Sequence, residues 1–306
     1  MRSIFGVHCA YGYGCCMNKR SDIQRVVILF SVPMQRAELS RVVQSLAARG
    51  WEIVALDHRE VEETFHARVE CRPRATWSGV DALKQELCVG EGYDESQITV
   101  QTVRQSPVLG LMLGESCCLL SDVTKNFASS SAPPDIAFIA SANDALEVHA
   151  DRHGVPFFLL ASNDTHEQEY ELNKLLRRYQ PSVVGVSRWQ NPLSAKFVRA
   201  HREVLFAVQS GFVAASVGQA VVSLETEWAV QHGAEVVVAS SFLYSDQIGR
   251  EVLLSQQSER VEGALNIESI EQVRQQQESD IFLHTVAKLL DCRVLVNTHR
   301  AVIFWT

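Results

Sequence analysis

The sequence predicts an α/β protein in two parts: a small ferredoxin-like βαββαβ domain, then a doubly wound, mostly parallel sheet. The first observation is the order strand–helix–strand–strand–helix–strand over residues 25–104. The second is the alternation of strand-like and helical stretches over residues 105–306. Residues 1–24 lack such a pattern, and we expect them to form a flexible N-terminal extension.

In the first domain, segments with the hydrophobic pattern of a strand and segments with that of a helix follow one another. RVVILFS at 25–31 is a β-branched, apolar run of strand type. The segment 37–50 has apolar residues at helical spacing and ends at Gly50, a typical helix stop. The remaining elements are expected at 51–60 and 64–72 (strands), 78–92 (helix) and 98–104 (strand).

In the second domain, expected strands recur along the chain with helices between several of them. Strands are expected at 108–114, 135–141, 156–162, 182–187, 204–208 and 235–244. Helices are expected at 143–154, 166–179 and 193–202, followed by a polar helix around 268–290. The chain then closes with a hairpin whose turn lies near Asn297 and Thr298.

The composition is that of a globular protein with an acidic balance. The chain has 306 residues, of which 46% are hydrophobic and 21% charged, and its formal net charge is −8. This charge disfavours nucleic acid and anionic membranes as partners. Apolar runs such as 108–114 are too short to span a bilayer, and residues 1–20 lack the apolar core of a signal peptide. We therefore expect a cytoplasmic protein.

The eight cysteines contain no C-x-x-C pair, so we expect reduced, mostly buried thiols. His149 and His153 stand four residues apart on an expected helix, a spacing that can bind zinc. A solvated helix face is the preferred interpretation, because no third ligand is evident. The sequence therefore predicts no metal and no required cofactor.

Four stretches, in this order and spacing, make the chain resemble the formyltetrahydrofolate deformylases over about residues 25–306. They are RVVILFSVP…LSRVVQSLAARGWEIVALD, PDIAFIASANDALEVHADRHGVPF, LLRRYQPSVVGVSRWQNPLSAKFV and CRVLVNTHRAVIF. Proteins of that family join an N-terminal ACT domain to a formyltransferase domain. They hydrolyse 10-formyltetrahydrofolate to tetrahydrofolate and formate, a step of one-carbon metabolism linked to purine biosynthesis.

The resemblance also places the family's catalytic segment, NIHHSFLPAF, on VLFAVQSGFVAAS at 204–216. The family's Asn, which stabilises the oxyanion, falls on Phe206, and its proton-handling His falls on Val208. The following His falls on Gln209, and only Ser210 is kept. Phenylalanine and valine have no donor, acceptor or titratable proton, so this strand lacks the family's chemistry.

The family's third catalytic group, an Asp, falls at or near Gly249, and Asp246 is the nearest carboxylate. The resemblance also places the loop beside the pterin on SRWQNPLS at 187–194. It thereby implies five candidate substrate-binding residues: Arg188, Trp189, Gln190, Asn191 and Leu193.

The ACT-like part shows a similar change. ACT domains bind effectors at a turn that contains Gly, and here Ala37 stands at that position in VPMQRAEL. We therefore expect this domain to serve for association into a homo-oligomer, most simply a dimer.

Two functional hypotheses follow. The first is a diverged member of the deformylase family, catalytically impaired, that binds a folate-type small molecule or regulates another protein. The second is an enzyme that hydrolyses formyltetrahydrofolate, or transfers its formyl group, with non-standard residues. The groups that surround Phe206 and Val208 should discriminate between them.

Overall fold

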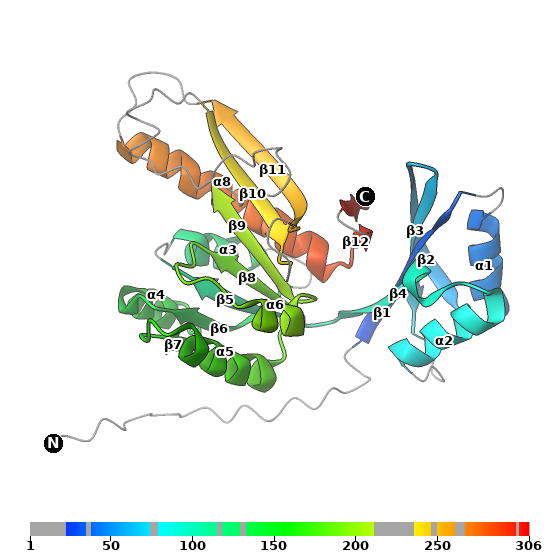
Figure 1. The fold of residues 1–306 in the computed structure, drawn as a ribbon, viewed down its shortest axis with the longest axis horizontal. Coiled ribbons are helices and arrows are strands. Elements are labelled where there is room, and N and C mark those ends of the chain that lie inside the picture. Colours follow the sequence, from blue (N-terminus) through cyan, green and yellow to red (C-terminus); the bar gives the residue numbers. More distant parts are fainter. Residues whose placement is uncertain are drawn as a thin grey trace.

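A computed structural model describes residues 23–34, 38–73, 79–114, 118–128, 133–210, 236–245, 250–260, 267–297 and 300–305. It contains a four-stranded antiparallel sheet and a seven-stranded mixed sheet, joined by a short connection (Figure 1). The mixed α/β architecture with a mostly parallel sheet confirms the fold class that the sequence predicts.

The N-terminal sheet has the strand order β2-β3-β1-β4, as expected for a βαββαβ domain. Its two helices cover one face, where the apolar residues of β1 and β3 meet those of α1 and α2. The elements are β1 (Ile23–Pro33), α1 (Glu38–Ala48), β2 (Glu52–Val61), β3 (Thr64–Arg72), α2 (Val80–Glu91), η2 (Glu95–Gln97) and β4 (Ile98–Arg104).

The second sheet has the order β11-β10-β9-β8-β5-β6-β7. The strands from β9 to β7 are parallel, while β10 runs antiparallel to both of its neighbours. The strands are β5 (Val108–Leu113), β6 (Asp135–Ser141), β7 (Phe157–Leu159), β8 (Val183–Ser187), β9 (Leu205–Ser210), β10 (Val236–Leu243) and β11 (Val252–Arg260).

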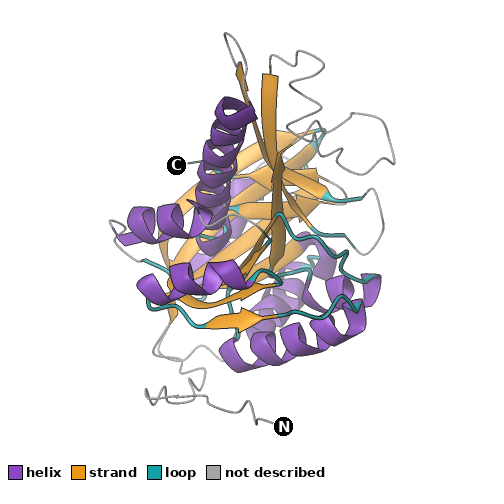
Figure 2. Cartoon of the chain, turned by 90° about the vertical axis from the view of Figure 1, so that its left-hand side faces the viewer, coloured by secondary structure: helices purple, strands orange, loops and turns teal. Residues whose placement is uncertain are grey.

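Helices cover both faces of this sheet (Figures 1 and 2). One apolar cluster joins the sheet to α3, α4 and α8, and a second joins it to α5 and α6. The helices are α3 (Cys118–Ala128), η3 (Asp144–Leu146), α4 (Glu147–Arg152), α5 (Thr165–Tyr179), α6 (Ala195–His201) and α8 (Ile267–Leu290).

The chain ends in a hairpin, β12 (Val294–Asn297) and β13 (Arg300–Ile303), which packs on the face of the N-terminal sheet away from its helices. Val27 and Leu29 of β1 meet Leu295, Val302 and Phe304 there, all of them buried. Figure 1 shows this hairpin between the N-terminal strands and the end of α8. The two sheets are therefore held together by more than their connection.

The bounds of several elements differ from the predicted ones; β7, for example, covers only Phe157–Leu159 of the expected 156–162. The sequence predicts that this strand ends at 208, but β9 continues through Ser210 because Gln209 and Ser210 both pair with β10. The expected helix over 143–154 is the short η3 followed by α4, which ends at Arg152. The strand β11 was not predicted, because its second half, SQQSER, is polar and exposed, as suits an edge strand.

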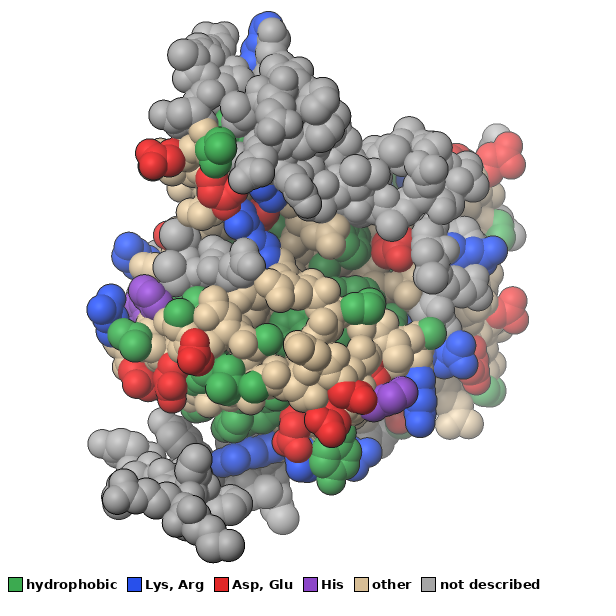
Figure 3. Space-filling view, turned by 60° about the vertical axis from the view of Figure 1, so that its left-hand side comes forward, with side chains coloured by type: hydrophobic (Ala, Val, Ile, Leu, Met, Phe, Trp, Pro, Cys, Tyr) green, Lys and Arg blue, Asp and Glu red, His purple; other side chains and the backbone are tan. Residues whose placement is uncertain are grey.

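The described part of the chain has no helix that is both long enough and apolar enough to cross a bilayer. Its cysteines Cys71, Cys88 and Cys292 are free thiols, in agreement with the expectation for these three. On the face shown in Figure 3, charged side chains of both signs gather mainly around the margin of a tan and green centre.

Candidate functional site

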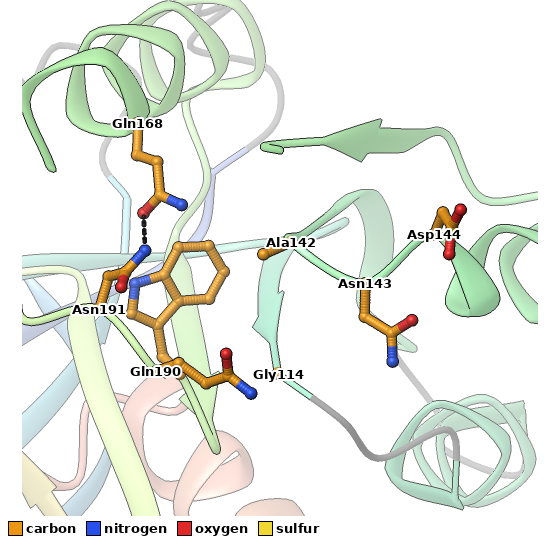
Figure 4. A pocket seen from close by; sticks show the side chains of 8 residues that line it. Gly114, Ala142, Asn143, Asp144, Gln168, Gln190 and Asn191 are labelled. Carbon is orange, nitrogen blue, oxygen red and sulfur yellow. Dashed lines mark hydrogen bonds between the residues drawn. The ribbon is translucent and has the colours of Figure 1, made fainter. Parts of the chain in front are cut away.

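The strand order reverses between β5 and β8, and a pocket lies beside this switch point. In parallel sheets the connections leave in opposite directions at such a point, which opens a crevice at the carboxyl ends of the strands. The pocket has a volume of about 270 Å³. It is lined by Gly114, Ala142, Asn143, Asp144, Gln168, Trp189, Gln190 and Asn191 (Figure 4).

The floor of the pocket depends on a close approach of two strand ends. The amide of Gly114, directly after β5, donates to the carbonyl of Ser187 at 2.9 Å. A β-carbon on Gly114 would collide with the carbonyl oxygen of Arg188. Glycine is therefore required where the loops after β5 and β8 meet.

Hydrogen bonds fix the amide side chains around the pocket. Asn191 donates to the Oε1 atom of Gln168 at 3.1 Å, and Gln168 donates to the carbonyls of Leu160 and Ser162. On the other side, Asn143 accepts from the amide of Ala145 and so caps η3. Figure 4 shows Gln168 and Asn191 on one side of the pocket and Asn143 on the other. The pocket is thus preformed and rich in carboxamides.

The predicted substrate-binding loop divides between two faces of the sheet. Trp189, Gln190 and Asn191 line the pocket. Leu193 instead packs with the apolar cluster under α5 and α6, and Arg188 reaches towards α8. Neither Leu193 nor Arg188 lines the pocket, so the five residues do not form one surface.

Arg188 joins a buried ionic cluster on α8. Its Nε donates to Glu278 at 2.7 Å and its Nη1 donates to Glu271 at 2.6 Å. Arg274 also pairs with Glu271 and donates through Nε to the hydroxyl of Ser210 at 2.8 Å, and Ser210 in turn donates to Glu278 at 2.6 Å. Burial, together with the neighbouring Arg188, lowers the pKa of Arg274. The polar groups at the end of β9 are therefore occupied by one another.

Phe206 and Val208 lie on the same face of β9, as residues two apart on a strand must. Both are 0% exposed and belong to the apolar cluster with α8. The ring of Phe206 lies 5.1 Å from that of Phe282, centroid to centroid. Gly185, which pairs with Phe206 across β8 and β9, leaves room for both rings, because a β-carbon there would collide with Phe282.

Around positions 206 and 208 the described residues therefore form an apolar wall. Neither of these two side chains can stabilise an oxyanion or move a proton, and the polar neighbour of Val208 on β8 is a hydroxyl, that of Ser187. Val208 is paired with Ser241 of β10, whose hydroxyl accepts from Thr285 and is fully buried. Charged groups meet β9 two residues beyond Val208, where the hydroxyl of Ser210 contacts Glu278 and Arg274.

The remaining residues that the sequence singled out lie away from the pocket or outside the described part of the chain. Gln209 is half-buried on the other face of β9 from Phe206 and Val208. Gly249, Asp246 and Ala37 lie outside the described residues. His153 lies at the C-cap of α4 rather than within the helix, and no cluster of three metal-ligand side chains occurs in the described ranges.

Sequence reasoning missed the residues that α8 brings to the site: Glu271, Arg274, Glu278 and Phe282. Their spacing of three, four and four residues places them on one helix face, and this pattern can be recognised in the sequence. It was not decisive, because charges at such spacing usually mark a solvated face. Asn143 and Asp144, at the start of η3 after β6, were predicted only as the beginning of a helix and not as part of a site.

The sequence is similar to that of a curated deformylase. It is 23% identical over 284 residues to the formyltetrahydrofolate deformylase of Bacillus subtilis (strain 168), covering 90% of this chain and 93% of the relative. No protein-family model matches the sequence.

Solved structures of deformylases and formyltransferases share the fold. The formyltetrahydrofolate deformylase of Pseudomonas syringae pv. tomato superposes with a TM-score of 0.78 at 19% identity, over 92% of this chain and 95% of that chain. The Burkholderia mallei enzyme of the same name gives 0.74 at 20% identity, over 92% and 100%. A glycinamide ribonucleotide transformylase from Symbiobacterium toebii gives 0.56 at 16% identity, over 66% and 96%.

Proposed function

We propose that this homologue of formyltetrahydrofolate deformylase binds a folate-type molecule at the switch-point pocket and is impaired in formyl hydrolysis. It would act as a binding or regulatory protein. The observation that carries the proposal is the apolar wall made by Phe206, Phe282 and Gly185 where the resemblance places the catalytic asparagine.

Hydrolysis of a formamide needs a donor for the developing oxyanion and a group that moves protons. One oxyanion donor contributes about 10²–10³ in rate, and a general acid–base group contributes about 10²–10⁴. Neither Phe206 nor Val208 supplies such a group. Loss of both functions supports an impaired rather than a slightly slower enzyme.

The pocket suits a flat, uncharged heterocycle with amide-like edges. Its lining contains four carboxamides, one indole and the carboxylate of Asp144, and no lysine or arginine among the described residues. The indole Nε1 of Trp189 is buried and has no hydrogen-bond partner in the described structure. A pteridine ring presents both donors and acceptors to such a lining, which supports a folate as the ligand.

A titration of the chain with 10-formyltetrahydrofolate, followed by tryptophan fluorescence, tests the binding part. The Trp189→Phe variant separates the pocket signal from the other four tryptophans. We expect saturable quenching that Trp189→Phe reduces and that Asn143→Leu weakens. Asn126→Leu, an exposed position on α3, is the matched control. Quenching unaffected by Asn143→Leu would contradict binding in this pocket.

The second hypothesis, catalysis by non-standard residues, is favoured by one observation only. The Ser210 hydroxyl and the Glu278 carboxylate lie 2.6 Å apart at the end of β9. Two arginines already contact this pair, which leaves the carboxylate a poor base for attack by serine or water. Formate release that Ser210→Ala abolishes, while folate binding persists, would favour this enzyme over the impaired protein.

A further inference from the structure

One residue in the loop after β8 has a backbone conformation that its residue type disfavours. Arg188 has a φ of 51°. In this left-handed region a side chain crowds the backbone, so glycine and asparagine are the usual occupants. Arg188 directly precedes Trp189, which lines the pocket. Backbone strain of this kind persists only where the surrounding contacts impose it, and it is frequent beside binding sites.

The main chain at Arg188 is held against the end of β5. The amide of Gly114 donates to the carbonyl of Ser187 at 2.9 Å, and the carbonyl oxygen of Arg188 occupies the space that a β-carbon on Gly114 would need. This contact brings the two strand ends together, but it does not require an arginine. A glycine at position 188 would satisfy the same backbone without strain.

The side chain of Arg188 supplies what a glycine would lack. Its guanidinium is held by two carboxylates on α8, with Nε bound to Glu278 at 2.7 Å and Nη1 to Glu271 at 2.6 Å. The two acids stand seven residues apart, which is about two turns of the helix. A planar guanidinium can bind both in a fixed direction, whereas the single ammonium of a lysine cannot. These contacts are charge-assisted and largely buried.

The next residue in the loop depends on this anchor. The indole Nε1 of Trp189 is buried and has no hydrogen-bond partner in the described structure. The side chain packs partly against the apolar cluster under α5 and α6. Its direction is therefore set by apolar packing and by the main chain that carries it, and not by a polar contact of its own.

We propose that Arg188 is the positioning residue of the pocket: its ion pairs with Glu271 and Glu278 hold a strained backbone that directs Trp189 into the pocket wall. The inference deepens the proposed function, on which it rests for the identity of the ligand. Without the guanidinium, the loop would adopt its binding conformation only part of the time. Apparent affinity falls in proportion to the competent fraction.

The indole Nε1–H signal of Trp189 in the full-length, ligand-free protein, labelled with ¹⁵N-tryptophan, tests the positioning. Trp189→Phe assigns this signal among those of the five tryptophans. We expect Arg188→Gly, which suits the backbone but removes the guanidinium, to shift or broaden it. Arg188→Lys, which keeps one charged contact, should give a smaller change. Gln180→Gly is the matched control and should change nothing, because exposed Gln180 also has a positive φ, of 43°, at the end of α5.

An unchanged Trp189 signal in Arg188→Gly would overturn the proposal. If Arg188→Gly does not fold, Glu271→Gln replaces it, because it removes the charge of one partner and keeps the shape of the side chain. Glu271→Gln should also shift or broaden the Trp189 signal, and an unchanged signal in that variant has the same meaning.

Binding provides the second measurement, with 10-formyltetrahydrofolate as the probe and tryptophan fluorescence as the readout. If the loop is competent in about one molecule of ten, Arg188→Gly should bind about tenfold more weakly than Gln180→Gly, with Arg188→Lys between them. A shifted Trp189 signal in a chain whose parent binds no folate would mean that the proposed ligand is wrong and the positioning stands. Equal affinity of Arg188→Gly and Gln180→Gly would mean that the positioning is wrong and the ligand stands.

Discussion

The aromatic rings of Phe206, near the start of β9, and Phe282 of α8 lie 5.1 Å apart, centroid to centroid. Both side chains are fully buried. They meet over Gly185, the only residue type that leaves space for the two rings at this position of β8. The strand that resembles a catalytic segment is thus part of a packed core, and its substitutions fit the neighbouring residues.

Gly185→Ala should destabilise the protein by about 1–3 kcal/mol, because the added methyl group collides with Phe282. The double variant Gly185→Ala, Phe282→Leu should recover part of this loss, since leucine is smaller than phenylalanine. Urea unfolding of the parent chain, the two single variants and the double variant gives the interaction free energy between positions 185 and 282. If the two substitutions change the free energy of unfolding additively, residues 185 and 282 do not compete for the same space.

Rescue of catalysis should need more than the missing groups. Phe206→Asn, Val208→His and Gly249→Asp together restore the family's residue types, which act as a unit. Phe282 fills the space beside position 206, so we expect the triple variant to regain little formate release and the quadruple variant with Phe282→Leu to regain more.

Burial of unpaired polar groups should lower the stability of these variants by roughly 1–3 kcal/mol per group. Thermal unfolding of the triple and quadruple variants, compared with that of the parent chain, measures this loss of stability. A folded, folate-binding quadruple variant without any activity would mean that the positions carried over from the family are wrong. Phe282→Leu alone is the control, and it should release no formate.

Acid should destabilise the junction between the two sheets through His66. The side chain is buried on β3, and burial, with Arg300 nearby, lowers its pKa from the ordinary value. As pH falls below about 6.5, the unfolded chain takes up a proton that folded His66 resists, so stability decreases. Urea unfolding between pH 7.5 and 5.5 should give a smaller decrease for His66→Gln than for the parent chain.

The exposed His153 provides the comparison for this experiment. His153→Gln should retain the decrease of the parent chain. An equal decrease in His66→Gln and His153→Gln would show that His66 does not contribute. Histidines other than His66 affect the parent and His66→Gln alike, so the difference between these two proteins reports His66.

Association through the N-terminal domain is expected to produce a dimer. β2 is an edge strand of ten residues that pairs only with β3 in the described structure, and Val54 is 46% exposed on it. Unpaired edges favour pairing with a second copy. Light scattering at micromolar concentration should give a dimer that Val54→Lys weakens, whereas Val89→Lys on α2 should have no effect. A monomeric parent chain would contradict this expectation.

Much of the fold could be predicted because local pattern and tertiary structure agree. The buried strand β8 and the amphipathic helix α5 have the hydrophobic periods that their surroundings require. The edge strand β11 could not be predicted in this way, because its polar second half contacts solvent. Its place in the sheet depends on pairing with β10, a contact between segments that no local period reveals.

The candidate site was predictable in part. The resemblance located the loop that contains Trp189 and Asn191, and both line the pocket. Which face each side chain takes was not predictable, because it depends on the ion pairs of Arg188 with α8, more than 80 residues away along the chain. Likewise, the fit between Phe206 and Gly185 arises from strand register, which a single sequence does not specify.

The rate of formate release from 10-formyltetrahydrofolate tests the central claim most directly. Because Phe206 and Val208 lack the groups that stabilise and move charge, we expect kcat/KM at least about 10³-fold below that of an intact deformylase assayed in parallel. The Phe206→Leu variant, which changes the wall without adding a polar group, should be equally inactive. Formate release by the parent chain at a rate near that of the intact enzyme would contradict the account.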